Sequence, residues 1–175
     1  LSADDQLGED LNKLFNQLSG FAPQYSYDRL LVAPRTIRSG LLERINREIE
    51  NKKAGKHAFI RLKLNSLLDE EFVEALYAAS IAGVEIDLVV RGICSLLPGI
   101  PGVSENIRVR SVLGRFLEHS RIFHFANGGD DEIYIGSADL MDRNLNRRVE
   151  SLVRITRAEH KKTLIKAFDL YVSST

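Results

Sequence analysis

The sequence has almost none of the features that would support a disulfide framework, a membrane anchor or a phosphate-binding loop. Its 175 residues include one cysteine, Cys94, which excludes an internal disulfide and a cysteine-based zinc site and is typical of a reducing compartment. No apolar run approaches the ~20 residues of a membrane span, and no secretory signal opens the chain. The patterns GxxxxGK[ST], GxGxxG and HExxH are absent. A nucleotide would therefore bind here without a familiar phosphate loop.

The chain also lacks an excess of charge of either sign. Lysine and arginine total 24, as do aspartate and glutamate, so the formal net charge at pH 7 is zero. This removes the simplest argument for binding nucleic acid, and we expect no nucleic-acid partner, although a groove can be basic on a neutral protein. The length and the hydrophobic content of 44% suit one domain, or a domain and a half, with a core of its own.

Apolar periodicity predicts alternating strands and helices. Helical spacing covers 3–19, 36–53, 69–82 and 158–172, and extended runs cover 29–33, 57–64, 84–90, 107–112, 116–125, 132–136 and 147–155. The order strand, helix, strand, helix, strand over 29–90 predicts parallel pairing, and the apolar run 84–90 is expected to be a central strand. We therefore expect an α/β fold with a mixed, mainly parallel sheet flanked by helices.

The stretch 116–144 contains the sharpest candidate site. On an extended segment, His119 and Arg121 project to the same side, and a histidine beside a fixed guanidinium suits a phosphate ligand. The turn 127–130, Asn-Gly-Gly-Asp, predicts a hairpin that brings Ser137 and Asp139 back toward His119, and Gly136 allows close backbone approach. A lone histidine is more often a hydrogen-bonded residue at a strand edge, but these neighbours favour phosphoryl chemistry.

Other candidates lie at the ends of predicted strands. Arg91 follows the run 84–90, where open α/β sheets place their ligands, and an exposed arginine covering a helix terminus is an equal alternative. Lys63 and Asn65 end an earlier strand, and Arg115 is a weak candidate among alternating arginines. For these three, a solvated or structural position is the alternative.

The remaining basic and histidine residues receive structural interpretations. A second basic cluster is by default a solvated patch; its members are Arg143, Asn144, Arg147 and Arg148. The other histidines, His57, His124 and His160, lack comparable neighbours, and we interpret all three as structural.

Several long runs resemble the carboxyl-terminal domain of polyphosphate kinases, which move the terminal phosphate of ATP onto polyphosphate. They are VRGIC, GxSENIRVRS, LEHSRI and SADxMxRNL, and the resemblance covers almost the whole chain. It implies a domain like one half of a phospholipase D-type fold. It further implies that residues 1–22 form a helix leading in from a preceding domain and that 23–175 form the carboxyl-terminal catalytic domain. Because the chain begins on Leu1 rather than methionine, we expect it to be part of a longer protein.

The resemblance also implies roles for individual residues. His119 would contact the nucleotide phosphates or act as a general acid, and Arg91 would neutralise developing charge. The histidine that becomes phosphorylated belongs, in this family, to the preceding domain. The residues expected to bind ATP or phosphate are Lys63, Asn65, Arg91, Arg115, His119, Arg121, Ser137, Asp139, Arg143 and Asn144.

The partners and the setting follow from the same resemblance. We expect ATP, ADP and polyphosphate as ligands, the preceding domain as an intramolecular partner, and a homo-oligomer for the full enzyme. Mg²⁺ is expected to arrive with ATP and to take its protein ligands outside this chain. The isolated domain is expected to be inactive. We expect a cytoplasmic location, with membrane association of the full enzyme left open.

Departures from the phospholipase D pattern HxKxxxxD weigh against a free-standing lipase or nuclease. Arg121 stands where lysine would be, Ala126 where aspartate would be, and Asp139 replaces asparagine in GSxN. Leu140 occupies a place where the kinase family often has an aromatic residue. Two alternatives stay open: a phospholipase D-type phosphodiesterase acting as a homodimer, and a non-catalytic domain that binds polyanions through the cluster at 143–148.

Overall fold

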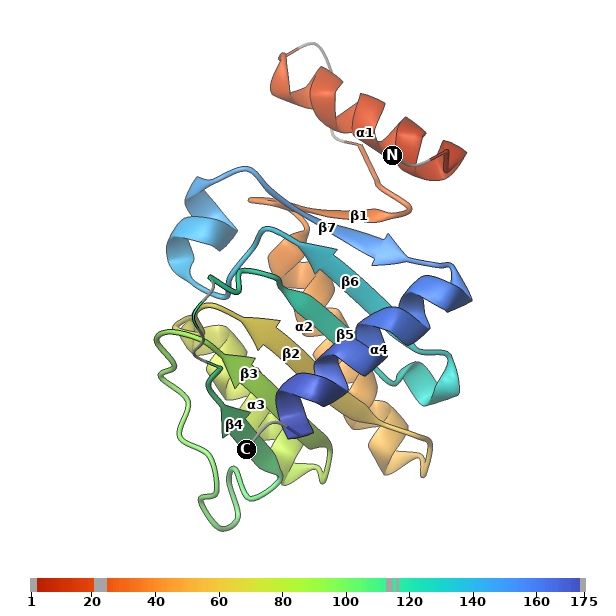
Figure 1. Cartoon of the computed structure of the whole chain (residues 1–175). Coiled ribbons are helices and arrows are strands. Elements are labelled where there is room, and N and C mark those ends of the chain that lie inside the picture. The colour runs from red at the N-terminus through yellow and green to blue at the C-terminus, as the bar shows by residue number, and fades with distance from the viewer. Residues whose placement is uncertain (1–2, 21–24, 113–114, 116, 174–175) are drawn as a thin grey trace.

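Seven strands form one sheet with helices on both faces in the computed structural model, which describes residues 3–20, 25–112, 115 and 117–173 (Figure 1). The strands are β1 (Leu30–Ala33), β2 (Phe59–Leu64), β3 (Glu85–Val90), β4 (Ile107–Arg110), β5 (Ile122–Phe125), β6 (Glu132–Gly136) and β7 (Glu150–Ile155). The helices are α1 (Asp5–Leu18), α2 (Ile37–Lys53), α3 (Glu70–Ile81) and α4 (Ala158–Ser173), with short helical turns at Asn127–Gly129 and Arg143–Arg147. Within these described ranges, no helix is both long and apolar enough to traverse a bilayer.

The sheet is mixed, as expected, but it is not mainly parallel. The strand order is β1-β7-β6-β5-β2-β3-β4. Only the pairs β2 with β3 and β3 with β4 are parallel, whereas β1 with β7, β7 with β6, β6 with β5 and β5 with β2 are antiparallel. The alternation of strands and helices at the start of the chain did not reveal that β5, β6 and β7 insert between β1 and β2. The prediction that 84–90 is a central strand is confirmed, because β3 pairs with β2 on one side and with β4 on the other.

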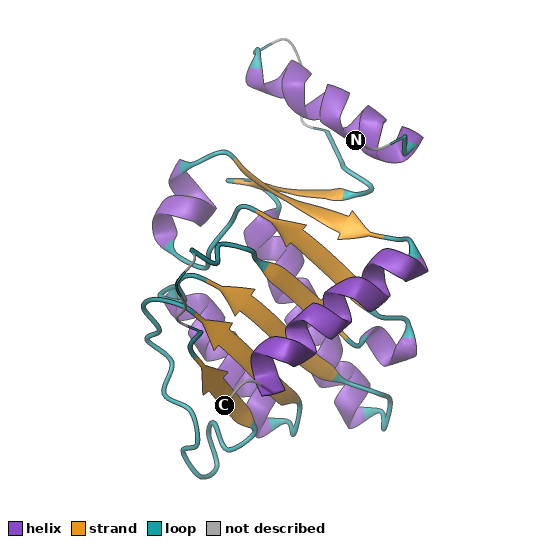
Figure 2. Ribbon diagram, viewed as in Figure 1, coloured by secondary structure: helices purple, strands orange, loops and turns teal. Residues whose placement is uncertain are grey.

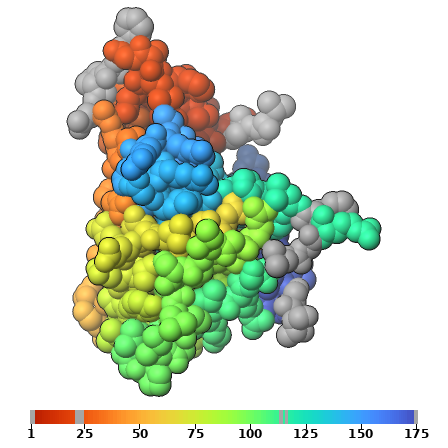
Figure 3. Space-filling model, turned by 90° about the vertical axis from the view of Figure 1, so that its left-hand side faces the viewer, coloured from red at the N-terminus to blue at the C-terminus, as the bar shows by residue number. Residues whose placement is uncertain are grey.

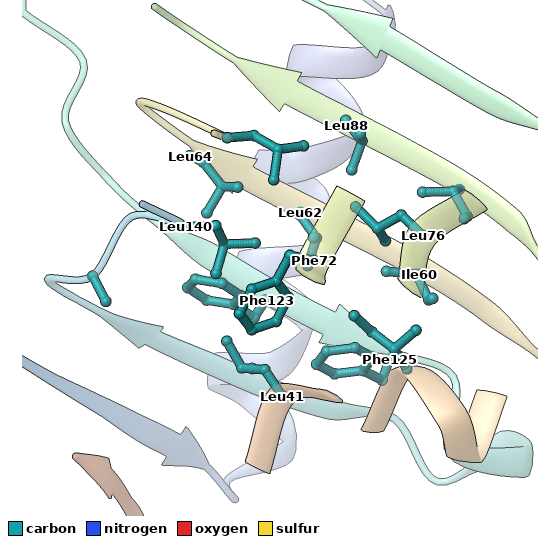
Figure 4. Packing of buried hydrophobic residues seen from close by; sticks show 14 of the residues in the cluster. Leu41, Ile60, Leu62, Leu64, Phe72, Leu76, Leu88, Phe123, Phe125 and Leu140 are labelled. Carbon is teal, nitrogen blue, oxygen red and sulfur yellow. The ribbon is translucent and has the colours of Figure 1, made fainter. Parts of the chain in front are cut away.

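The main core fills the space between the sheet and the helices α2 and α3. Ile37, Leu41 and Ile45 recur at helical spacing on α2, and each is at most 1% exposed. They belong to one cluster with residues of α3 and of the central strands. Figure 4 shows Leu41 of α2 beside Phe123 and Phe125 in this cluster. Since burying one Leu, Ile or Phe side chain contributes about 1.5–3 kcal/mol, this face accounts for most of the apolar stabilisation.

The opposite face of the sheet lies under α4 (Figure 2). Polar side chains on this face include Lys63 and Arg61, which contact rings of α4. Phe168 is the one buried residue among those described on α4, and Arg61 of β2 lies over its ring, 5.8 Å from the centroid. His124 is buried on β5 with its Nε2 2.9 Å from Asp131, and burial lowers the pKa of this histidine. This position agrees with the structural interpretation of His124.

Helix α1 packs on β1 at the edge of the sheet, with Leu14 against Leu30 and Val32, and carboxylates also tie it to this strand (Figure 1). The buried Asp10 accepts hydrogen bonds from the backbone N–H groups of Arg29 at 2.7 Å and Leu30 at 3.2 Å. Asp4 caps the helix by accepting from the N–H of Leu7, and it also accepts from Arg29 Nη1 at 2.7 Å. That 1–22 leads in from a preceding domain stays a prediction.

The segment before β5 is not the strand that the sequence predicts. Strand β5 begins at Ile122, and residues 117–121 have no regular structure, while Phe116 lies outside the described residues. The hairpin itself is confirmed, because β5 and β6 pair antiparallel from Ile122 opposite Ile135 to Phe125 opposite Glu132. His119 is therefore held by side-chain contacts and not by a strand ladder.

Glu132 anchors α2 to the hairpin through a buried ionic network. Its carboxylate accepts hydrogen bonds from Arg44 Nε at 2.9 Å, Arg47 Nη1 at 2.5 Å and the Tyr134 hydroxyl at 2.7 Å. Burial by itself would raise the pKa of Glu132, but Tyr134 and the two arginines outweigh it and hold the pKa at about 2. In turn, burial and the neighbouring Glu132 raise the pKa of Tyr134 to about 12.

Replacing Glu132 with glutamine is expected to reduce the free energy of unfolding by about 3 kcal/mol at pH 7, because two arginines lose their carboxylate. The carboxylate's contribution is complete above the unfolded pKa of 4.5 and falls as the pH drops toward the folded value of about 2. Urea unfolding at pH 7 and pH 3 checks both statements. The difference in the free energy of unfolding between wild type and Glu132→Gln should be smaller at pH 3 than at pH 7. An equal difference at both pH values would contradict the role of the charge.

Gly136 allows the ends of β6 and β7 to meet. A Cβ atom at this position would lie 2.0 Å from the Ser151 carbonyl oxygen and 2.9 Å from Leu152 Cα, so the close approach predicted from the sequence is confirmed. We expect Gly136→Ala to separate the two strands and to lower the melting temperature by several degrees. Gly8→Ala is the matched control, because nothing lies within 4 Å of the added methyl and α1 should become slightly more stable. Equal melting temperatures for the two variants would refute the close approach.

Candidate functional site

A hollow of about 470 Å³ opens at the carboxyl ends of β2 and β3. Its lining residues are Asn65, Ser66, Arg91, His119, Arg121, Ser137, Asp139, Arg143, Asn144, Arg148 and Glu150. Figure 3 looks onto this side of the molecule, where the blue atoms of the segment around 143–148 lie above the yellow and green atoms of the segments after β2 and β3. The hollow therefore joins parts of the chain that are far apart in sequence.

His119 and Arg121 contact each other closely in this hollow. Arg121 Nη1 lies 3.1 Å from His119 Nδ1 and donates to the His119 carbonyl at 2.8 Å, and Nη2 lies 3.3 Å from Nε2. A guanidinium group has only donors, and an imidazole ring has at most one acceptor nitrogen, so at most one of the two ring contacts can be a hydrogen bond. The predicted proximity of the two side chains is confirmed, although it arises in an irregular segment.

Asp139 holds the guanidinium group of Arg121 in place. Its Oδ2 lies 2.9 Å from Arg121 Nη2, and its Oδ1 accepts from the backbone N–H groups of Asn65 at 2.7 Å and Ser66 at 3.4 Å. Burial would raise the pKa of Asp139, but the hydrogen bonds from Arg121 and Asn65 outweigh it, and the pKa lies below its ordinary value. The carboxylate therefore connects the end of β2 with the residue that holds His119.

The segment after β6 contributes further polar groups. Asn144 is 3% exposed and donates from Nδ2 to Glu150 Oε1 at 2.7 Å, whereas its Oδ1 has no hydrogen-bond partner among the described residues. Ser137 accepts from the N–H of Ser151 at 3.3 Å. These bonds hold the short helical turn of Arg143–Arg147 against the start of β7.

Positive charge prevails in the hollow. Four arginines line it against two carboxylates, Asp139 and Glu150. Arg91 follows β3 directly, and its N–H donates to the Leu64 carbonyl at 3.1 Å, which extends the parallel pairing of β2 and β3 to the rim. A surface of this kind, with planar guanidinium groups near one another, is suited to a polyphosphorylated ligand.

Eight of the ten predicted binding residues line the hollow, and two do not. Lys63 points to the α4 side, where its ammonium group lies 4.8 Å from the centre of the Tyr171 ring. Arg115 is exposed and lies outside the lining.

The lining also includes Ser66 and Glu150, which the sequence did not single out, and Arg148, which the sequence places in the second basic cluster but not among the predicted binding residues. From the sequence, the cluster that contains Arg148 is interpreted as a solvated patch. In the structure the members of this cluster separate: Arg148 lines the hollow, whereas Arg147 pairs with Asp142 on the surface. The only sequence signal for Ser66 is its position next to Asn65. The only one for Glu150 is its position near the basic cluster at 143–148.

The carboxylates of the hollow do not form a metal cage. Asp139 is bound to Arg121 and two N–H groups, and Glu150 to Asn144, so neither presents a free pair of oxygens. Over the described ranges, no group of three or more His, Cys, Asp or Glu side chains could hold an ion. These residues therefore do not fit a metal held by this chain.

Comparison with known proteins gives consistent matches. A family model described as polyphosphate kinase C-terminal domain 2 matches residues 30–175. The polyphosphate kinase of Streptomyces coelicolor is 58% identical over 164 residues, which cover 94% of this chain and 22% of that protein. The polyphosphate kinase of Prochlorococcus marinus is 53% identical over 173 residues, covering 99% of this chain and 24% of that protein.

Solved structures agree on the fold. The crystal structure of polyphosphate kinase from Porphyromonas gingivalis matches with a TM-score of 0.93 and 41% identity, covering 98% of this chain and 26% of that chain. The phospholipase D family member Nuc from Salmonella typhimurium matches with a TM-score of 0.59 at 15% identity, over 82% of this chain and 91% of that chain, which shows the shared fold alone.

This chain spans about a quarter of the length of the kinases that it matches. With a matching model over 30–175 and relatives above 50% identity, the chain belongs to the family of polyphosphate kinase C-terminal domain 2.

Proposed function

We propose that this chain binds the phosphates of ATP in a polyphosphate kinase and takes part in moving the terminal phosphate to polyphosphate. The observation that carries the proposal is the hollow in which His119 lies among four arginines. Such a site is suited to a triphosphate, whose charge spreads over several oxygens. The family supports the reaction class. We further propose that residues outside this chain complete the site, since the chain covers 22% of the length of the Streptomyces coelicolor kinase.

In the proposed reaction, a nucleophile outside this chain attacks the γ-phosphorus of ATP, and the bond from that phosphorus to the β,γ-bridging oxygen breaks. ADP leaves with the electron pair of that bond. Arg91 and its neighbours stabilise the negative charge that develops on the phosphate oxygens. His119 either contacts these oxygens or donates a proton toward the leaving ADP, and Arg121 orients its ring.

The proposal includes Mg²⁺ that enters with ATP and takes its protein ligands outside this chain. The engagement of Asp139 and Glu150 by Arg121 and Asn144 supports this view. We also propose that the preceding part of the polypeptide supplies the phosphorylated histidine and that the full enzyme is a homo-oligomer.

A phosphodiesterase of the phospholipase D type is the weaker candidate. The shared fold is the observation in its favour. Against it, Arg121 is held by Asp139, and Ala126, at the place of the pattern's aspartate, is fully buried. A chromogenic phosphodiester tests it, because hydrolysis that disappears in His119→Ala would favour the phosphodiesterase.

Replacing His119 with alanine in the full-length polypeptide is expected to lower ATP-dependent polyphosphate synthesis by at least about a hundredfold. The melting temperature should stay the same, because the side chain is exposed. Synthesis is followed by incorporation of labelled γ-phosphate into polymer. His160→Ala is the matched control, since His160 is an exposed histidine on α4 outside the hollow. Near-normal synthesis by His119→Ala, or turnover by the 175-residue chain alone, would rule out the shared site.

Two substitutions at Arg91 separate charge from geometry. We expect Arg91→Ala to reduce kcat/KM for ATP by about a hundredfold, and Arg91→Lys to recover only part of this loss because an ammonium group lacks the planar fork. Steady-state kinetics in the full-length polypeptide measures both values. Arg110→Ala on β4, outside the hollow, should leave kcat/KM unchanged. Full activity of Arg91→Lys would show that charge alone is sufficient.

A further inference from the structure

We propose that Lys63, Glu118 and Tyr171 position His119, and that Lys63 acts on the peptide around His119 instead of binding ATP. These three residues are called the clamp below. The proposal rests on the proposed function and adds positioning residues to the same site. It also replaces the role predicted for Lys63 from the sequence.

Glu118 closes a tight turn around His119. Its Oε1 accepts from the N–H of Ser120 at 2.9 Å and from the Ser120 hydroxyl, so the side chain of the residue before His119 holds the residue after it. The hydrogen bonds from Ser120 are the main reason why the pKa of Glu118 is lowered to about 2. Glu118 is therefore ionised throughout the neutral range.

Lys63 connects this turn to the sheet. Its Nζ lies 3.1 Å from Glu118 Oε1 and donates to the Ser120 carbonyl at 2.9 Å, and the side chain is 3% exposed. The position of Lys63 is fixed because β2 pairs with both β3 and β5. A buried ammonium group with such partners has little freedom to reach a ligand in the hollow.

Tyr171 connects the same turn to α4. Its hydroxyl donates to Glu118 Oε2 at 2.9 Å, and its ring lies under the ammonium group of Lys63 at 4.8 Å. Glu118 thus accepts on both carboxylate oxygens, from the turn, from β2 and from α4. Because residues 117–121 belong to no strand, these contacts replace the ladder that would otherwise hold the segment.

Arg121 and the clamp contact different parts of the segment around His119. Arg121 contacts the ring and the carbonyl of His119, whereas the clamp holds the flanking residues 118 and 120. A proton donor or phosphate ligand must lie within hydrogen-bond reach of the reacting oxygen, and a displacement of about 1 Å can cost about a hundredfold in rate. Loosening the clamp should therefore affect the reaction step more than nucleotide binding.

Tyr171→Phe tests the proposal with the removal of one oxygen atom. In the full-length polypeptide we expect kcat to fall about tenfold, with KM for ATP changed by less than about twofold and an unchanged melting temperature. Tyr27→Phe is the matched control, because the Tyr27 hydroxyl also donates to a side-chain oxygen, Gln17 Oε1 at 2.7 Å, and Tyr27 is not part of the lining of the hollow. Equal kcat values for wild type and Tyr171→Phe would overturn the proposal.

Lys63→Met separates positioning from ATP binding. Loss of the ammonium group should lower kcat and leave KM for ATP nearly unchanged, and the double variant with Tyr171→Phe should lose less than the product of the two single effects. A large rise in KM for ATP in Lys63→Met, with Tyr171→Phe silent, would instead assign Lys63 to the ligand.

The NMR signals of the histidine side chains in the full-length protein report on the clamp independently of activity. The signal of His119 is the one missing in His119→Ala. Tyr171→Phe and Lys63→Met should shift this signal, and Tyr27→Phe should not. If the protein had no kinase activity, these shifts would still support the clamp, whereas an unmoved His119 signal in both variants would refute it even in an active enzyme.

Discussion

The ion pair between Arg121 and Asp139 is the contact on which the candidate site depends. Asp139 comes from the loop after β6, accepts from the N–H groups at the end of β2, and holds the arginine that contacts His119. Both charges are nearly buried, with side chains 9% and 5% exposed. Removing either partner would leave the other buried without compensation, which is costly. The pair thus fixes the relative positions of three segments before any ligand binds.

The local elements could be predicted from the sequence, but the order of the strands could not. Apolar spacing located α2, α3, β2 and β3 within about two residues, because each element buries one regular face. The antiparallel insertion of β5, β6 and β7 depends on long-range pairing that no local pattern encodes. The same distinction between local patterns and long-range contacts applies to the residues of the candidate site. Arg91 and Asn65 were found because they follow strands, while Glu150 was missed because its partner, Asn144, comes from the turn that folds back over the hollow.

Lys63 shows why residue type and position are insufficient to assign a role. Lys63 lies within β2, one residue before the strand ends, whereas Asn65 follows the strand. Because side chains alternate along a strand and the neighbouring Leu62 and Leu64 face the core, Lys63 faces the opposite side of the sheet. Asn65 lies at the hollow, whereas Lys63 is buried under α4. The two faces have separate tasks: the apolar face under α2 and α3 stabilises the fold, and the polar face under α4 supports the segment of His119.

The attachment of α1 to β1 has a consequence for self-association. β1 is an outer strand of the sheet, and such strands offer unpaired N–H groups to strands of other molecules. Here the N–H of Leu30 donates to Asp10, and the N–H of Val32 donates to the Thr36 hydroxyl at 2.8 Å. At the other edge, β4 carries Arg110, whose charge opposes the addition of a further strand, and Arg108, which is paired with Asp87 of the neighbouring β3. Both borders of the sheet are thereby protected against edge-to-edge aggregation.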